Sequence, residues 1–379
     1  MELKERIALA QNWLLHSGIQ AKSGAFNSWL DLDSETYPFA YSEITGYALT
    51  TLVFLNGEGK GSHIESASSA AKWLEEEAVT KEGAVKARQY HDANQADKRF
   101  SFKEGNIFSF DCGMVMKGFL SFYNQTGKKS YLAAAKRIAS FLDEKMGRKG
   151  EMHAVYNLNS RKFLDSSSKW SWQPGAYHAK NAIAYIQLSE ATGDKSLLET
   201  AKNLCESALK MQEPSGRFVT SAKDKSTHLH PHCYAAEGLL YAGTKLGEKR
   251  FVEAAKKAAE WAISNQAKNG GINPFFDGSW NSNQRSDVIA QVLRLYSALN
   301  STGNIEKKYS ANAKLLEERL VSFQNLQEGQ QQGGFFYGKE LDGNPRNSLN
   351  SWCTMFALQA LSWFENLAGG KALNMELLI

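Results

Sequence analysis

One plan recurs along this sequence, and its repetition constrains the fold more than any other feature. Each copy has an apolar segment, a turn ending in glycine, a second segment with one polar face and then a loop. Four copies begin at residues 110, 177, 232 and 286, and a looser copy begins at residue 42. Glycine at such turns supplies the left-handed conformation that ends many helices. The turn glycines are Gly57, Gly127, Gly193, Gly247 and Gly303. The repeat predicts five helical hairpins.

The two segments of a hairpin differ in their hydrophobic pattern. In residues 110–122 apolar side chains occur almost all round a helix, which is typical of a helix buried on every side. In residues 129–145 one apolar stripe includes Leu132, Ala135 and Ile138, while Lys136 and Arg137 lie on the other face. We therefore expect an inner layer built from the first helices and an outer layer built from the second.

The two ends of the sequence complete the count. Residues 351–370 read as a sixth inner helix without an outer partner, and the N-terminal segment, with Leu3, Ile7, Ala10 and Leu14 on one stripe, reads as an outer helix without an inner one. Pairing these two helices would close a ring and cover the apolar ends that an open helical solenoid must cap. The sequence thus predicts an all-α (α/α)6 toroid of six hairpins, as a single domain over residues 1–379. An open solenoid is the alternative.

Composition excludes several functional classes. Hydrophobic residues make up 42% of the 379 residues and charged residues 22%, which indicates a globular chain with a sizeable core. The formal net charge is only +4, and no Lys/Arg run with interleaved aromatics occurs, so we expect no nucleic-acid partner. No segment approaches 18 apolar residues and the first helix carries scattered charges, so we expect no membrane span and a cytoplasmic location. The oligomeric state is left open.

The four cysteines, Cys112, Cys205, Cys233 and Cys353, are widely spaced and form no CxxC pair. This spacing argues against a disulfide framework and against a standard structural zinc site. A zinc site assembled from His228, His230, His232, Cys233 and Cys353 is the alternative. We expect neither a metal nor a cofactor.

Candidate functional residues come from the starts of the predicted inner helices. Long loops precede these starts, so we expect the starts to converge in a bowl at one end of the ring. Six helix N-termini would give the bowl a positive potential and favour an anionic substrate such as an acidic sugar. The candidates at the helix starts are Tyr41, Glu43, Asp111, Tyr177, His178, His230, His232, Arg285, Asp287 and Trp352. We expect Trp170, Trp172 and Trp280, in the loops, to form the wall, because sugar rings stack on flat apolar faces.

Three segments carry a resemblance to a known group of proteins. YSEITGY (41–47), FSFDCG (108–113) and THLHPHCYAAEGLL (227–240) resemble those of bacterial and archaeal six-hairpin toroid proteins associated with polysaccharide synthesis or processing. Those proteins are similar in plan to unsaturated glucuronyl and rhamnogalacturonyl hydrolases, and more remotely to N-acylglucosamine 2-epimerases. In the uronyl hydrolases an Asp at the start of an inner helix is the general acid/base. The resemblance implies that role for Asp111, on an oligosaccharide or acidic sugar.

The leading hypothesis is a glycosidase-like enzyme in which Asp111 and Asp287 are acid/base or electrostatic partners. Glycoside hydrolysis commonly needs one protonated and one ionised carboxyl group. A helix N-terminus lowers the pKa of a carboxyl group, so burial or a second carboxylate would have to reverse this for an acid. A simpler interpretation is that both residues only cap their helices.

Two other functions remain open. His178, His230 and His232 could supply the bases of a sugar epimerase or of a uronate lyase, or could only tie loops or bind a ligand. The chain could also be a glycan-binding ring without catalysis. No DxDD or DDxxD segment occurs, which disfavours terpene cyclisation and prenyl transfer.

Overall fold

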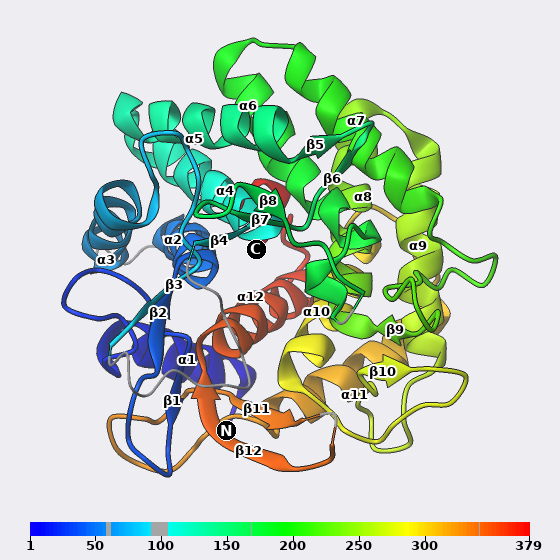
Figure 1. Cartoon of the computed structure of the whole chain (residues 1–379). Coiled ribbons are helices and arrows are strands. Elements are labelled where there is room, and N and C mark those ends of the chain that lie inside the picture. The colour runs from blue at the N-terminus through cyan, green and yellow to red at the C-terminus, as the bar shows by residue number, and fades with distance from the viewer. Residues whose placement is uncertain (58–61, 92–104, 168, 341) are drawn as a thin grey trace.

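The computed structural model describes residues 1–57, 62–91, 105–167, 169–340 and 342–379. Within these ranges the chain forms two concentric layers of α-helices (Figure 1), so the predicted all-α (α/α)6 toroid is confirmed. The inner helices are α2 (Ser42–Gly57), α4 (Ser109–Thr126), α6 (Asn181–Thr192), α8 (Leu229–Leu246), α10 (Ser286–Ser301) and α12 (Ser351–Ala368). A 3₁₀ segment, η6 (Ala176–Lys180), leads directly into α6. The outer helices are α1 (Leu3–His16), α3 (Ser62–Trp73), α5 (Lys129–Phe141), α7 (Ser196–Leu209), α9 (Lys249–Ser264) and α11 (Ser310–Val321).

Burial separates the two layers as the hydrophobic pattern predicts. Every residue of α4 from Ser109 to Phe122 is buried, since neighbouring helices surround it. The outer helix α9 buries only one stripe, which includes Phe251, Ala255 and Ile263. On folding, an inner helix removes apolar surface from water on all its sides, and an outer helix does so on one side. This burial is what holds the layers together.

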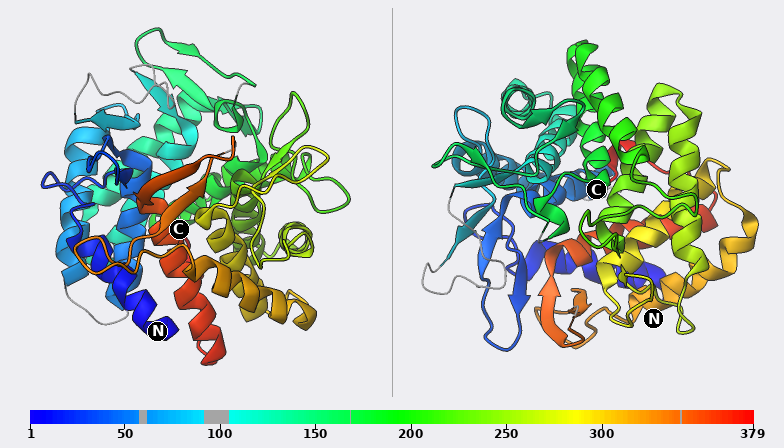
Figure 2. Two further views of the ribbon diagram at one scale, coloured as in Figure 1. Left: turned by 90° about the horizontal axis from the view of Figure 1, so that it is seen from below. Right: turned by 45° about the vertical axis from the view of Figure 1, so that its right-hand side comes forward.

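The ring closes through the first and last helices. Helix α1 packs against α12, and the Lys4 ammonium lies 3.5 Å from the Glu365 carboxylate. Seen from below, α1 runs beside α12 (Figure 2). The predicted pairing of the two ends is therefore confirmed, and the open solenoid is excluded.

Glycines set two of the closest helix approaches in the inner layer. A Cβ atom on Gly118 of α4 would lie 2.7 Å from the Gly46 carbonyl oxygen of α2. A Cβ atom on Gly238 of α8 would lie 2.2 Å from the Ala179 carbonyl carbon of η6. Any side chain at either position would push two inner helices apart. These glycines thus fix the spacing of the helices that carry the candidate site.

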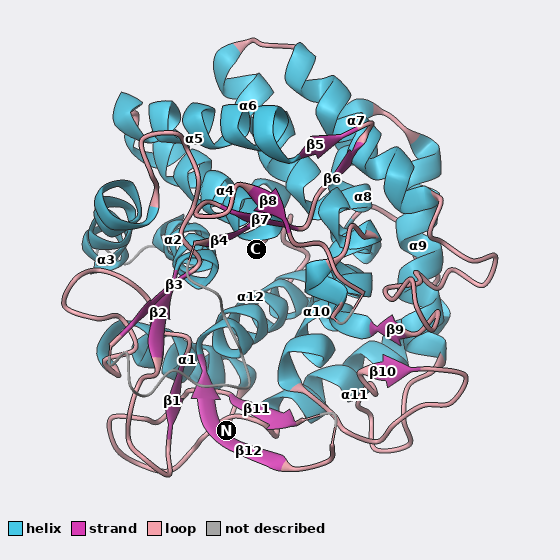
Figure 3. Cartoon of the chain, in the orientation of Figure 1, coloured by secondary structure: helices cyan, strands magenta, loops and turns pink. Residues whose placement is uncertain are grey.

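Short antiparallel strands occur only in the loops (Figure 3). Among the described residues they make sheets of two or three strands. The strands are β1 (Trp29–Asp31), β2 (Phe39–Tyr41), β3 (Arg88–Tyr90), β4 (Asn106–Phe108), β5 (Gly147–Arg148), β6 (Glu151–Met152), β7 (Val155–Asn157), β8 (Lys162–Phe163), β9 (Thr227–His228), β10 (Phe275–Phe276), β11 (Phe336–Lys339) and β12 (Pro345–Asn350). Several of them lead directly into an inner helix, as β2 leads into α2 and β4 into α4. They therefore fix the backbone just before the candidate residues.

The last residues of the chain lie inside the ring. Ile379 is 1% exposed, and its backbone N–H donates to the Gln359 side-chain oxygen of α12 at 3.1 Å. The Leu377 carbonyl accepts from the Gln359 amide at 2.7 Å. The segment from Leu373 to Ile379 thus occupies part of the ring's interior, where it contacts inner helices.

Candidate functional site

The starts of the inner helices bring acidic and aromatic side chains together. Glu43 lies in the first turn of α2 and Asp111 in the first turn of α4. Strand β2 pairs with β3 so that Tyr41 lies opposite Arg88, which brings a guanidinium group to the same place. The Arg88 guanidinium carbon lies 5.1 Å from the centre of the Tyr41 ring. These four residues form the first of two centres. We call its two acidic residues, Glu43 and Asp111, the carboxyl pair.

The carboxyl pair is nearly cut off from solvent. Glu43 is 9% exposed and Asp111 is 3% exposed. Burial, followed by the charge of Glu43 and a hydrogen bond with it, raises the pKa of Asp111 well above its usual value, and Arg88 offsets this only partly. Burial also raises the pKa of Glu43, against hydrogen bonds from Tyr41 and Tyr47. Two neighbouring buried carboxyl groups cannot both ionise cheaply, so the pair favours the form in which one of them keeps its proton.

Helix capping does not explain why an Asp occupies position 111. No side chain caps the start of α4, and Asp111 is the third residue of that helix. Its Oδ2 atom is buried and has no hydrogen-bond partner among the described residues. A buried polar atom without a partner is costly. This carboxyl oxygen is therefore available to a molecule that the structure does not contain.

The second centre is built around Asp287 in the first turn of α10, which is fully buried. The Arg285 Nε–H donates to its Oδ1 at 3.1 Å, and the Trp352 indole N–H donates to its Oδ2 at 3.2 Å. The His230 Nδ1 atom lies 3.3 Å from Oδ2. We call Arg285, Asp287, His230 and Trp352 the Asp287 centre.

The Asp287 centre holds the opposite ionisation state. Burial would raise the pKa of Asp287, but Arg285 and His230 outweigh it and lower that pKa. Burial lowers the pKa of His230 to about 3, against the charge of Asp287. His230 is therefore neutral at pH 7, and Arg285 is the counter-ion of an ionised Asp287.

Aromatic side chains connect the two centres. The Tyr47 hydroxyl donates to the Tyr234 hydroxyl at 2.9 Å, and the Tyr234 ring centre lies 4.6 Å from that of Phe110 and 4.4 Å from that of His230. Trp170 lies edge-on to both Tyr177 and His230, at 5.2 and 5.9 Å between ring centres. Glu43, Asp111, Tyr41, His230, Asp287, Arg285, Trp352, Tyr177 and Trp170 thus belong to one connected group.

Other predicted residues lie away from this group. The His232 Nδ1 atom accepts from the Phe218 N–H at 3.2 Å, and its Nε2 atom is 3.1 Å from the Ala258 carbonyl oxygen of the outer helix α9. The Trp280 indole donates to Asn265 at 3.2 Å and its ring packs on Trp261. Both side chains fasten loops to the outer layer.

Trp172 and His178 lie at the edge of the group. Trp172 packs edge-on to Phe108 of β4, at 5.8 Å between ring centres. The His178 Nε2 atom is 2.9 Å from the Ser109 hydroxyl, and its Nδ1 atom accepts from the Gly175 N–H at 3.5 Å.

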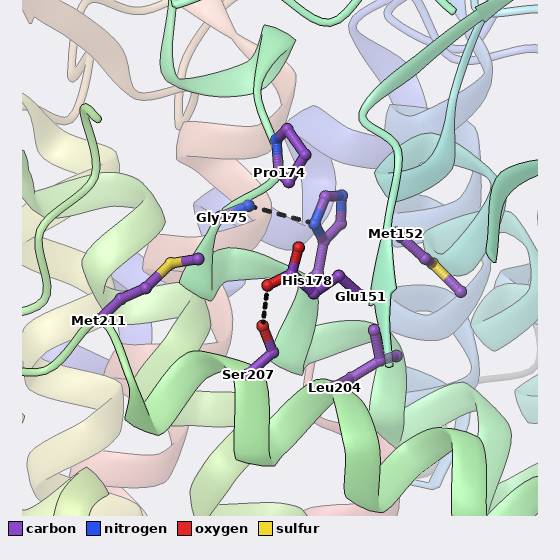
Figure 4. A pocket seen from close by; sticks show the side chains of 8 residues that line it. All are labelled: Glu151, Met152, Pro174, Gly175, His178, Leu204, Ser207 and Met211. Atoms are coloured by element: carbon purple, nitrogen blue, oxygen red, sulfur yellow. Dashed lines mark hydrogen bonds between the residues drawn. The ribbon is translucent and has the colours of Figure 1, made fainter. Parts of the chain in front are cut away.

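His178 also borders a small cavity that reaches the outer helix α7 (Figure 4). The cavity is lined by Glu151, Met152, Pro174, Gly175, His178, Leu204, Ser207 and Met211. Its volume of about 10 Å³ suits a single water molecule at most, so it is too small for a sugar. None of its other lining residues belongs to the carboxyl pair or to the Asp287 centre.

Sequence reasoning missed several residues that lie within or next to the connected group. Arg88 lies in a short strand whose pairing no local pattern indicates. Tyr47 and Tyr234 lie in helices read as apolar, where a tyrosine is an ordinary core residue. Lys180, Glu237 and Arg294 carried a usable signal, because a charge inside a helix that is otherwise buried all round requires a partner.

Two general properties complete the description. Among the described residues no cluster of three or more His, Cys, Asp and Glu side chains has the geometry to hold a metal ion. None of the helices in the described ranges combines the length and the hydropathy needed to cross a membrane.

The same fold occurs in solved structures of other proteins. A sugar epimerase from a ruminal bacterium superposes with a TM-score of 0.77 at 13% identity, over 94% of this chain and 98% of the other. Cellobiose 2-epimerase from Bacillus thermoamylovorans has a TM-score of 0.74 at 12% identity, over 95% and 99% of the two chains. An unsaturated glucuronyl hydrolase from Bacillus sp. GL1 has a TM-score of 0.72 at 13% identity, over 96% and 97%.

No family model and no curated protein matches the sequence. The structural likeness at these identities establishes the fold, and it confirms the expected resemblance to six-hairpin toroid proteins.

Proposed function

We propose that this chain, residues 1–379 as one domain, is a carbohydrate-active enzyme whose acid/base group is the Glu43–Asp111 carboxyl pair. The observation that carries the proposal is the raised pKa of Asp111 beside Glu43, in a buried place at two inner helix starts. The helix-end effect that would have kept Asp111 ionised is overcome by burial and by a second carboxyl group, in that order. The superposed structures, which are sugar epimerases and a glucuronyl hydrolase by name, support a sugar or oligosaccharide as substrate.

The reaction that suits the pair best is hydrolysis of a glycosidic bond. Asp111 donates its proton to the leaving oxygen, water adds to the sugar carbon, and the Glu43 carboxylate accepts the proton that water loses. The same proton transfers suit addition of water to an unsaturated sugar. Glu43 and Asp111 begin the neighbouring inner helices α2 and α4, and each raises the cost of ionising the other. In this proposal they act together as a proton-sharing pair.

An epimerase, isomerase or lyase is the second candidate, and His230 favours it. A neutral imidazole beside an ionised carboxylate is a competent base for removing a proton from a sugar carbon. Sugar epimerases and a D-mannose isomerase are among the structures with this fold. In this version the carboxyl pair would only bind the sugar.

Isotope labelling separates the two candidates. The protein is incubated with neutral and acidic oligosaccharides, including unsaturated uronyl disaccharides, in H₂¹⁸O and separately in D₂O. Hydrolysis or hydration places ¹⁸O in the product, whereas epimerisation places deuterium on carbon without cleavage, and elimination leaves a new double bond.

Two variants then assign the group responsible. We expect Glu43→Gln to abolish ¹⁸O incorporation while His230→Gln retains part of it. The reverse result would move the chemistry to His230. Binding of a glycan with no product from any substrate would favour a non-catalytic ring.

A further inference from the structure

A buried ionic cluster lies beneath the carboxyl pair, in the interior of the ring. The Lys180 ammonium of η6 donates to the Glu237 Oε2 atom of α8 at 2.6 Å. The Arg294 Nε–H of α10 donates to the other oxygen of Glu237 at 2.9 Å. All three side chains are at most 1% exposed. The three side chains carry two positive charges and one negative charge, and the last residue, Ile379, contributes an oxygen atom 2.7 Å from the Lys180 ammonium.

Lys180 faces the candidate site through two tyrosines. Its ammonium lies 4.4 Å from the centre of the Tyr234 ring and 5.6 Å from that of Tyr47. The hydroxyls of these tyrosines are hydrogen-bonded to each other, and Tyr47 follows Glu43 by one helical turn on the buried part of α2. A single aromatic layer therefore separates Lys180 from Glu43. In such a dry, low-dielectric region a charge acts across several ångströms.

We propose that Lys180 is a positioning residue that keeps Glu43 the ionised member of the carboxyl pair and so leaves the proton on Asp111. This inference rests on the proposed function, and it assigns the roles of acid and base within it. Lys180 does not touch the pair. It acts through its charge, which Glu237 holds in place and partly compensates.

Other charged and titratable groups face Glu43, and they must be counted. The Tyr41 hydroxyl and the Arg88 charge favour its ionised form. Asp111 acts against it. The Lys180 charge also lowers the pKa of Glu43. Arg88 also favours the ionised form of Asp111.

Lys180 itself is charged in the working range. Burial lowers its pKa to about 8 and the Arg294 charge acts in the same direction, while Glu237 opposes both. From the other side, the Ile379 carbonyl oxygen accepts a hydrogen bond from Lys180 at 2.7 Å. Below about pH 8 the ammonium is therefore present to act on Glu43.

Two variants that break the same ion pair give opposite expectations. Lys180→Met removes a positive charge, so the midpoint of Glu43 protonation should rise by on the order of one pH unit. Glu237→Gln removes the compensating negative charge, so the midpoint should fall in the acidic range where Lys180 stays protonated without Glu237. Lys117→Met is the matched control, because Lys117 is also a buried lysine of the ring interior but is bonded to Ser121 and to the Glu376 carbonyl oxygen instead of to Glu237.

The titration is read without any substrate. Infrared difference spectra of the carboxyl stretch are recorded against pH, and the Glu43 and Asp111 signals are assigned by their loss in Glu43→Gln and Asp111→Asn. Circular dichroism checks that each variant is folded. Shifts of opposite sign in the Lys180 and Glu237 variants, with none in the Lys117 variant, support the inference. Shifts of the same sign, or none, overturn it and leave Lys180 a structural residue.

The acid limb of kcat/KM provides the second readout. The apparent pKa of this limb should rise in Lys180→Met and fall in Glu237→Gln, together with the infrared midpoints. If the infrared midpoints shift as expected but no sugar is turned over, the electrostatic role of Lys180 stands and the proposed function fails. If turnover is carboxyl-dependent but neither midpoint moves, the proposed function stands and the role of Lys180 fails.

Discussion

The carboxyl pair and the Asp287 centre occupy equivalent places and have opposite protonation states. Asp111 is in the first turn of α4 and Asp287 in the first turn of α10, and both are almost fully buried. The pKa of Asp111 is raised by burial and Glu43, whereas Arg285 and His230 lower that of Asp287 despite its burial. Helix position and burial are shared, so neither explains the difference. The neighbouring side chain decides it, a carboxyl group in one case and a guanidinium group in the other.

The strongest test of this comparison is Asp111→Asn. The amide is nearly isosteric but cannot exchange a proton, so turnover should fall on the order of 10²-fold or more while the protein stays folded. Asp143→Asn is the matched control, because Asp143 is a partly buried Asp of raised pKa, bonded to Tyr185 away from the site. Steady-state rates on the substrate found by labelling measure both. Equal turnover in the two variants would remove Asp111 from the chemistry.

Loss of the Arg285 cation from the Asp287 centre should lower the free energy of unfolding. Arg285→Met leaves a fully buried carboxylate without its counter-ion, which should cost ~3–5 kcal/mol of unfolding free energy at pH 7. Denaturant unfolding measures this loss. The double variant Arg285→Met with Asp287→Asn should regain most of it, since the orphaned charge is gone. A double variant no more stable than the single one would show that Arg285 stabilises by packing on Tyr337, 4.5 Å away, and not by charge.

The ring could be predicted because its signal is spread over the whole chain. Alternation between segments such as 110–122 and 129–145 recurs, so an error in one copy does not change the result. The closure of α1 on α12 followed from two incomplete ends. The short strands could not be predicted in detail, because two or three residues carry too little pattern.

The site could be predicted only in part, because its contacts join distant parts of the sequence. Being at a helix start identified Glu43, Asp111 and Asp287 as candidates, but it gave no information on their partners. Asp287 has its counter-ion two residues away in Arg285, and even that pair was not recognised. The partner of Asp111 lies on another hairpin, so the proton-sharing pair required the structure.

A smaller effect follows from the linkage between protonation and stability. The pKa of Asp111 is higher in the folded than in the unfolded chain, so between these two values the folded state binds more protons. Its contribution to stability is complete below the unfolded value and is lost as the pH rises through the folded one. Asp111→Asn has no such loss, so its melting temperature relative to the unmodified chain should increase as the pH rises above the ordinary Asp value of 3.8. For Asp287→Asn, whose wild-type pKa is lowered, no such increase is expected.

The smallest effect should come from His178, which lies between the two layers at the edge of both centres. Burial lowers the pKa of His178 to about 3, and its two ring nitrogens are occupied by Ser109 and the Gly175 N–H. A neutral imidazole already bonded on both sides has no free nitrogen with which to exchange a proton with a sugar. His178→Gln should therefore change kcat by less than about threefold and lower stability by about 1 kcal/mol, the usual cost of one lost internal hydrogen bond. His230→Gln is the matched variant, since His230 is equally neutral but lies against Asp287 within the connected group. Measuring kcat and KM separately for both variants would define the boundary of the site. A loss of about 10²-fold in kcat for His178→Gln, with the melting temperature unchanged, would contradict this expectation. It would extend the site beyond the carboxyl pair and the Asp287 centre and restore the catalytic role that the sequence suggested.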